Sequence, residues 1–167
     1  MNREADDGLS ALSSRIAGIY GEHAPAMAEK FLRSSLELKG KRLSRSDLPL
    51  FNQLGISLRR QGRWQDAITE YKRALKIAPD DAALYYNVGM AFAEGNDFIQ
   101  AKANLVKAMD VEPTMTKDNA TIACNFGAVF LQTGDRERSA QFFKSALALK
   151  PDMKIALQGL QRAQGKG

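Results

Sequence analysis

The feature that most constrains this chain is a set of residues that recurs along it at a nearly constant spacing. Two residue types mark the spacing: Pro79, Pro113 and Pro151, and Gly55, Gly89 and Gly127. Both sets step by 34 residues and then by 38, so two independent markers report the same period. A period of roughly 20 to 50 residues is typical of proteins that stack copies of one small structural unit. We therefore expect a repeat protein.

Eight positions recur three times with this spacing. The first unit has Phe51, Leu54, Gly55, Leu58, Ala67, Tyr71, Ala74 and Pro79. The second has Tyr85, Val88, Gly89, Phe92, Ala101, Leu105, Ala108 and Pro113. The third has Ala123, Phe126, Gly127, Phe130, Ser139, Phe143, Ala146 and Pro151. Over residues 48 to 151 the pattern resembles that of the tetratricopeptide repeat (TPR) family, from which it departs at Ala123 and Ser139.

Apolar residues at positions i, i+3, i+4 and i+7 predict two helices in each unit. We expect helices at 48–60, 64–77, 82–94, 98–111, 117–133 and 136–149. The glycines and alanines of the pattern are small where helix axes must approach closely, and each proline ends a second helix. Asp80, Asp81 and Asp152 are predicted N-caps. The four added residues near Met115 either lengthen the next helix by a turn or form a longer loop.

The fold expected is an all-α, right-handed solenoid of helical hairpins. It contains three TPR units at about 48–81, 82–115 and 120–153. Residues 1–47 are predicted to form a helical hairpin, which a degenerate repeat would also explain, followed by a basic linker. In the hairpin, Met27, Phe31 and Leu38 follow Pro25, which suits a first helical turn. Residues 152–167 supply a capping helix, with an apolar stripe that includes Leu157, and a tail.

Several function classes are excluded by what the chain lacks. One cysteine, Cys124, cannot form an intramolecular disulfide, and one histidine, His23, cannot complete a zinc site with it. Phosphate-loop and metalloprotease motifs are absent, and no nucleophile lies beside a base. We predict no enzyme activity, no cofactor and no metal. Without a signal peptide or a long apolar run, a cytoplasmic protein is expected.

The resemblance implies that the first helix of each unit lines a concave groove that binds a peptide or a partner segment. The candidate groove residues are Asn52, Gln53, Ile56, Arg59, Arg60, Tyr86, Asn87, Met90, Asn125 and Leu131. Gln53, Asn87 and Asn125 stand two residues before the three glycines. A row of amides can hold an extended peptide by its backbone, since each offers a donor and an acceptor. The alternative is that these amides only solvate the groove.

Family members that grip the acidic tail of heat-shock chaperones use five basic and amide residues. The matching positions here are Asn52, Ile56, Asn87, Thr121 and Asn125. Only Asn87 agrees, so capture of a terminal carboxylate is not expected. A softer resemblance, over residues 47 to 95, is to the C-terminal TPR region of bacterial response regulators, which implies a role in signalling.

Charge adds a further expectation. The net charge of +5 is concentrated on the N-terminal side of the array. Three interpretations of this cluster are open. It is a solvated face, or it is a surface that binds an acidic partner. The least favoured interpretation is a nucleic-acid site built from Arg42, Arg45, Arg59, Arg60 and Arg63. The competing class of function is a self-assembling scaffold that uses Tyr85, Tyr86 or the N-terminal hairpin, which would make the protein a homo-oligomer.

Overall fold

The computed structural model describes residues 8, 11–13, 15, 19 and 24–165, and its regular structure is entirely helical over this part of the chain. The α-helices are α2 (Pro25–Lys39), α3 (Leu48–Arg60), α4 (Trp64–Leu75), α5 (Ala82–Glu94), α6 (Phe98–Val111), α7 (Ala120–Gln132), α8 (Arg136–Leu149) and α9 (Lys154–Ala163). Two short 3₁₀ turns, η1 (Gly40–Arg42) and η2 (Arg45–Asp47), join α2 to α3. The predicted all-α class is confirmed.

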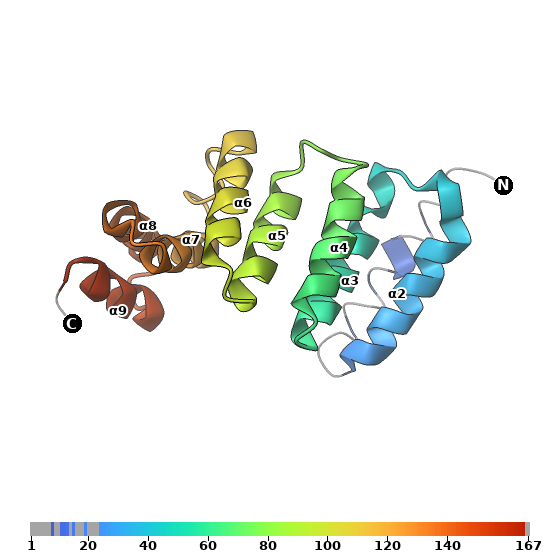
Figure 1. Cartoon of the computed structure of the whole chain (residues 1–167), viewed down its shortest axis with the longest axis horizontal. Coiled ribbons are helices and arrows are strands. Elements are labelled where there is room, and N and C mark those ends of the chain that lie inside the picture. Colours follow the sequence, from blue (N-terminus) through green and yellow to red (C-terminus); the bar gives the residue numbers. More distant parts are fainter. Residues whose placement is uncertain (1–7, 9–10, 14, 16–18, 20–23, 166–167) are drawn as a thin grey trace.

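Consecutive helices pair as hairpins, and the hairpins follow one another in a row (Figure 1). The pairs α3 with α4, α5 with α6, and α7 with α8 form the three units, with α2 at one end and α9 at the other. Each hairpin also contacts the next one, through α4 with α5 and α6 with α7. The predicted helical-hairpin solenoid is therefore confirmed.

The hydrophobic core runs along the solenoid in three consecutive clusters. The first joins α2, α3, α4 and part of α5, the second joins α5 and α6 to α7 and α8, and the third joins α7 and α8 to α9. Every cluster joins a unit to a neighbouring unit or to an end helix, because a single helical hairpin cannot cover its own apolar face. The units consequently stabilise one another as neighbours.

The three repeated glycines lie where a first helix contacts the second helix of its own unit. A Cβ atom at Gly55 would lie 2.2 Å from the Tyr71 ring, and one at Gly127 would lie 2.8 Å from the Phe143 ring. At Gly89 the nearest atom would be Cδ2 of Leu105, at 2.9 Å. The prediction that these positions must be small is confirmed, and the contact fixes the rotation of each first helix.

The third unit shows where the four added residues go. Helix α7 begins at Ala120, so the prediction of a helix from residue 117 is wrong and the longer loop is the correct alternative. The reason is local, since the Asn119 side chain accepts hydrogen bonds from the backbone N–H groups of Thr121 and Ile122 and ends the loop there. Met115, which is buried in the second core cluster, anchors that loop.

The predicted N-caps are correct in one case. Asp81 caps α5 by accepting a hydrogen bond from the backbone of Leu84. Asp80 instead forms an ion pair with Arg45. Asp152 is not a cap, because Met153 occupies that position and makes no side-chain cap bond. Caps that the sequence analysis missed start α6 at Asp97 and α8 at Asp135.

Both ends of the array differ in detail from expectation. Pro25 begins α2 as predicted, but Met27 and Leu38 are exposed, and the buried face is formed by Ala28, Leu32, Ser35, Leu36 and Lys39. The first helix of the predicted hairpin falls largely outside the described residues. At the other end, Leu157 in α9 is exposed, while Ala156, Gly159 and Ala163 are buried. These small residues let α9 lie close to the preceding unit.

Candidate functional site

The candidate groove residues lie on α3, α5 and α7, the first helices of the three units, and we call the surface they form the first-helix face. Its orientation follows from the glycine contacts, because the side of each first helix that carries Gly55, Gly89 or Gly127 faces the second helix of the unit. Residues three positions away, such as Asn52 and Tyr86, are half-buried rather than enclosed in the core. Each first helix thus presents polar side chains at its partly exposed edge.

The amides of the first two units meet directly. The Nδ2 atom of Asn87 in α5 donates a hydrogen bond to Oδ1 of Asn52 in α3 at 3.2 Å. Both side chains are half-buried. Gln53, which was expected in this row, is also half-buried, but its side chain makes no hydrogen bond within the described residues. The structure therefore brings together Asn52 and Asn87, and not Gln53 and Asn87.

The third amide contacts the neighbouring unit through a tyrosine. The Nδ2 atom of Asn125 in α7 donates a hydrogen bond of 2.6 Å to the hydroxyl oxygen of Tyr86 in α5. The Tyr86 ring is stacked on Phe126, with 6.3 Å between ring centroids and 9° between planes. Burial raises the pKa of Tyr86 and outweighs the lowering effect of the bond from Asn125. Tyr86 is therefore a neutral acceptor held in a fixed position.

Arg59 is engaged within the protein. Its guanidinium bonds both carboxylate oxygens of Glu94, with Nε at 2.9 and 3.0 Å and an Nη atom at 2.5 Å. Burial alone would lower the pKa of Arg59, but the hydrogen bonds and negative charge of Glu94 outweigh it and raise that pKa. The neighbouring Arg60 is exposed and has no ion-pair partner within the described residues. Of these two predicted site cations, Arg60 is the available one.

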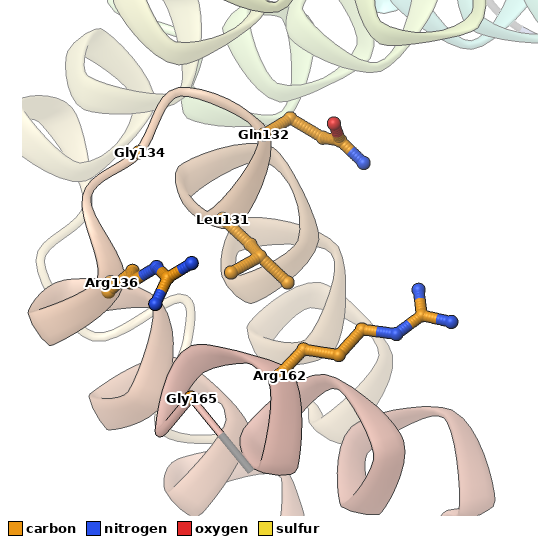
Figure 2. Close-up of a pocket in the computed structure, with 6 residues that line it drawn as sticks. All are labelled: Leu131, Gln132, Gly134, Arg136, Arg162 and Gly165. Carbon is orange, nitrogen blue, oxygen red and sulfur yellow. The ribbon is translucent and has the colours of Figure 1, made fainter. Parts of the chain in front are cut away.

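The remaining groove candidates are apolar and half-buried. Ile56 lies on α3 and Met90 on α5. Leu131, at the end of α7, lines a pocket together with Gln132, Gly134, Arg136, Arg162 and Gly165 (Figure 2). The three apolar side chains extend the first-helix face from the first unit to this pocket. The pocket itself was missed by sequence reasoning, because its arginines are 26 residues apart and belong to different helices.

The basic residues on the N-terminal side mostly have acidic partners. They form the ion pairs Lys39–Asp47, Arg45–Asp80, Arg59–Glu94, Arg63–Glu29 and Arg63–Asp66. A cation that is already paired with a carboxylate of the protein is less available to an anionic ligand. Arg60 is exposed at this end and has no ion-pair partner within the described residues.

Other chemistry finds little support in the described part of the chain. Cys124 is buried and carries no disulfide, and burial raises the pKa of its thiol, which disfavours the reactive thiolate. No group of three or more histidine, cysteine, aspartate or glutamate side chains is arranged there to hold a metal ion. Among the described helices, none is long and apolar enough to cross a membrane.

Comparison with known families identifies the repeat. A model of the tetratricopeptide repeat matches residues 82–115 and 120–153, and a model described as TPR repeat matches residues 55–96. The chain belongs to the tetratricopeptide repeat family. Ser139, where the TPR pattern has alanine, is fully buried and donates a hydrogen bond of 2.7 Å to the backbone oxygen of Gly127. The departure from the pattern is thus satisfied inside the unit.

Relatives and solved structures agree with this family. Mouse (Mus musculus) Protein O-mannosyl-transferase TMTC3 is 23% identical over 133 residues, which are 73% of this chain but only 14% of that protein. A structure of a MamA RS-1 ArsTM double mutant superposes with a TM-score of 0.73 at 20% identity, covering 95% of this chain and 84% of that one. The first TPR of Spaghetti (RPAP3), bound to the HSP90 peptide SRMEEVD, gives a TM-score of 0.61 at 19% identity, with coverage of 70% and 89%. These structural likenesses show the shared fold.

Proposed function

We propose that this chain is a non-enzymatic adaptor that binds an extended segment of another protein on the first-helix face. The observation that carries the proposal is the set of half-buried amides contributed by three successive units, Asn52, Asn87 and Asn125. Binding by TPR proteins supports it, since the Spaghetti structure holds an HSP90 peptide.

We also propose a cytoplasmic location, because a single free cysteine suits a reducing compartment.

The amides retain hydrogen-bonding capacity after their internal bonds are made. A primary amide has two N–H donors and one carbonyl acceptor. Asn87 and Asn125 each use one N–H donor in these bonds. Their Oδ1 atoms accept no hydrogen bond from the described residues. These oxygens can accept from the backbone N–H groups of an extended peptide. Such bonds do not depend on the identity of the peptide's side chains. They fix the direction of the peptide along α5 and α7.

The internal bonds also keep the amides oriented before a peptide arrives. Asn87 is held by Asn52, and Asn125 is held by a tyrosine whose ring is stacked on Phe126. Fixing a side chain in advance removes part of the entropy cost of binding. This arrangement favours a peptide site over the alternative in which the amides only solvate the groove.

The test is the double variant Asn87→Ala plus Asn125→Ala. Partners captured from the source organism by the wild-type chain are identified by mass spectrometry, and their affinities are then measured by calorimetry. Each lost hydrogen bond should cost about 0.5 to 1.5 kcal/mol, up to about tenfold in affinity per site. Asn104→Ala on α6, whose amide bonds only the backbone of Gln100, is the matched control. Wild-type affinity in a folded double variant would contradict the proposal.

A second candidate function is self-association through α2. Met27 and Leu38 are 65% and 75% exposed, and Met27 and Phe31 line a shallow apolar pocket with Lys30 and Ser34. Tyr85 and Tyr86 are less suited to this role, because each already bonds within the chain. Sedimentation across a concentration range distinguishes the two functions. A monomer at high micromolar concentration would eliminate self-assembly as the main role.

The finer proposal is that the adaptor acts in bacterial signalling. It rests on the resemblance of residues 47 to 95 to the TPR region of response regulators. A phosphorylated receiver domain among the captured partners would support it, and capture confined to partners outside signalling would contradict it.

A further inference from the structure

A pocket lies at the C-terminal end of the array. It has a volume of about 870 Å³ and is lined by Leu131, Gln132, Gly134, Arg136, Arg162 and Gly165. Leu131 and Gln132 end α7, Gly134 lies in the turn before α8, Arg136 begins α8, and Arg162 and Gly165 lie at and just beyond the end of α9. Figure 2 shows the Leu131 side chain between the side chains of Arg136 and Arg162. One pocket thus combines two cations, an amide and an apolar side chain.

The two arginines are not neutralised by the protein. Both are exposed, and neither makes an ion pair or a side-chain hydrogen bond within the described residues. Two acidic residues flank Arg136 in the sequence. Asp135 is engaged by Lys102 at 3.0 Å and by Arg138 at 2.7 Å, and the exposed Glu137 forms no ion pair with either pocket arginine. Residues 136–167 carry seven lysines and arginines against two acidic residues. The residues that line the pocket include two cations and no acidic side chain.

The chemistry of the lining identifies the ligand class. A guanidinium binds carboxylates and phosphates through paired N–H donors. No aromatic ring lines this pocket, and Phe126, Phe130 and Phe143 nearby are buried in the core, so bases of a nucleic acid would have nothing to stack on. Leu131 suits an apolar side chain next to an acidic one. This combination favours a protein segment over a nucleic acid.

We propose that this pocket binds an acidic segment of the partner protein. Arg136 and Arg162 hold Asp or Glu carboxylates, Gln132 bonds the segment's backbone, and Leu131 contacts an apolar neighbour of the acidic residues. The inference rests on the proposed function and deepens it, because Leu131 ends the first-helix face on which the segment runs. The acidic side chains of the segment therefore bind at the C-terminal end of the array and not in its centre.

The test is an NMR titration of the full, ¹⁵N-labelled chain with the acetylated and amidated peptide SEELEGS, which has no terminal carboxylate. The uncharged peptide SQQLQGS and a ten-nucleotide thymidine strand are the comparison probes. We expect shifts at the side-chain Nε–H groups of Arg136 and Arg162 and at the amides of Gly134 and Gly165 with SEELEGS. The uncharged peptide should bind at least tenfold more weakly. No shifts with millimolar SEELEGS at physiological salt would overturn the proposal.

Pairs of variants distinguish binding at this pocket from attraction by the positive charge of the whole protein. Arg136→Gln with Arg162→Gln should weaken SEELEGS binding at least tenfold, whereas Lys144→Gln with Lys154→Gln should change it less than twofold. The control pair removes the same charge from exposed positions that do not line the pocket. Arg136→Lys with Arg162→Lys retains charge and should lose part of the affinity. Equal losses in the two glutamine variants, or tighter binding of the oligonucleotide at these arginines, would overturn the proposal.

The same titration tells this inference apart from the proposed function. Shifts confined to the side-chain amides of Asn87 and Asn125 would support the peptide-binding face and overturn the acidic pocket. Shifts confined to Arg136 and Arg162 would support the pocket and contradict the amide site. Shifts at both places are the result expected when one segment spans them.

Discussion

The two most basic segments of the chain differ in what surrounds their charges. Residues 39–63 and residues 136–167 each carry seven lysines and arginines. In the first segment four of these seven cations form ion pairs, as Lys39–Asp47, Arg45–Asp80, Arg59–Glu94 and Arg63–Glu29. In the second segment Arg136 and Arg162 have no such partner within the described residues. The two segments have the same number of cations, but more of the ion pairs form in the first segment, and two arginines of the second segment remain open to solvent.

The spacing of the ion pairs explains the difference. Arg45 and Arg59 each pair with a carboxylate 35 residues further on, and Arg63 pairs with one 34 residues earlier. These separations equal about one repeat, so the partner is supplied by the neighbouring unit. Helix α9 has no described unit stacked beyond it. Whether a cation is available to a ligand therefore depends on whether a neighbouring unit supplies its carboxylate partner.

The largest effect is expected where the N-terminal charges are buried. The Lys39 Nζ atom lies 2.5 Å from a carboxylate oxygen of Asp47, and the side chains are 5% and 0% exposed. Asp47→Ala would leave a buried ammonium without its ion-pair partner Asp47, at a cost of about 3 to 5 kcal/mol in the free energy of unfolding. Urea unfolding at neutral pH measures it, with the exposed Asp152→Ala as control. A loss below about 1 kcal/mol would show that this charge is not structural.

The next effect tests whether the two ends share the same packing despite their different charges. Ala74 and Ala146 are both fully buried at equivalent positions. Ala74→Leu and Ala146→Leu should each overpack a helix contact and cost about 1 to 3 kcal/mol. Thermal melting measures both, and Ala103→Leu, at an exposed position of α6, should change little. Unchanged melting of one variant would mean that its unit is assigned the wrong register.

A smaller effect concerns pH at the paired end. Burial would raise the pKa of Glu29, but hydrogen bonds from Arg33 and Gln61 and the charge of Arg63 outweigh it and lower that pKa. Unfolding therefore takes up protons as the pH falls below about 4.3, and the stabilisation present at neutral pH is lost there. Glu29→Gln should cost about 0.5 to 1 kcal/mol at neutral pH. Urea midpoints should converge between the two proteins as the pH falls from about 5 to about 3. A constant gap would contradict the role of this carboxylate.

The smallest effect on the free energy of unfolding is expected at the C-terminal arginines. Arg136→Gln with Arg162→Gln should change the free energy of unfolding by less than about 0.5 kcal/mol, because both side chains are exposed and unpaired. Arg59→Gln should cost about 1 kcal/mol, because it removes the partner of Glu94. Urea unfolding of the two variants side by side tests the difference. Equal losses would mean that the C-terminal arginines are structural as well.

Much of the fold was predictable because its determinants are local. The glycine contacts at Gly55, Gly89 and Gly127 follow from residue spacing along single helices, and the bounds of α3, α5 and α6 match the predicted ranges. The start of α7 was not predictable from period alone, since a turn of helix and a loop both accommodate four residues. There the side chain of Asn119 decides between them.

The sequence by itself determined the repeat, the helices and the face on which Asn87 and Asn125 lie, because helical periodicity is a property of neighbours along the chain. Only the tertiary structure decided that Asn87 bonds Asn52 and that Arg59 is held by Glu94. It also decided that Arg136 and Arg162 share a pocket. The Asn87–Asn52 and Arg59–Glu94 contacts join residues 35 positions apart, which is about one unit, and the pocket joins the last unit to α9. All of them form only when stacking sets the distance and rotation between neighbouring elements.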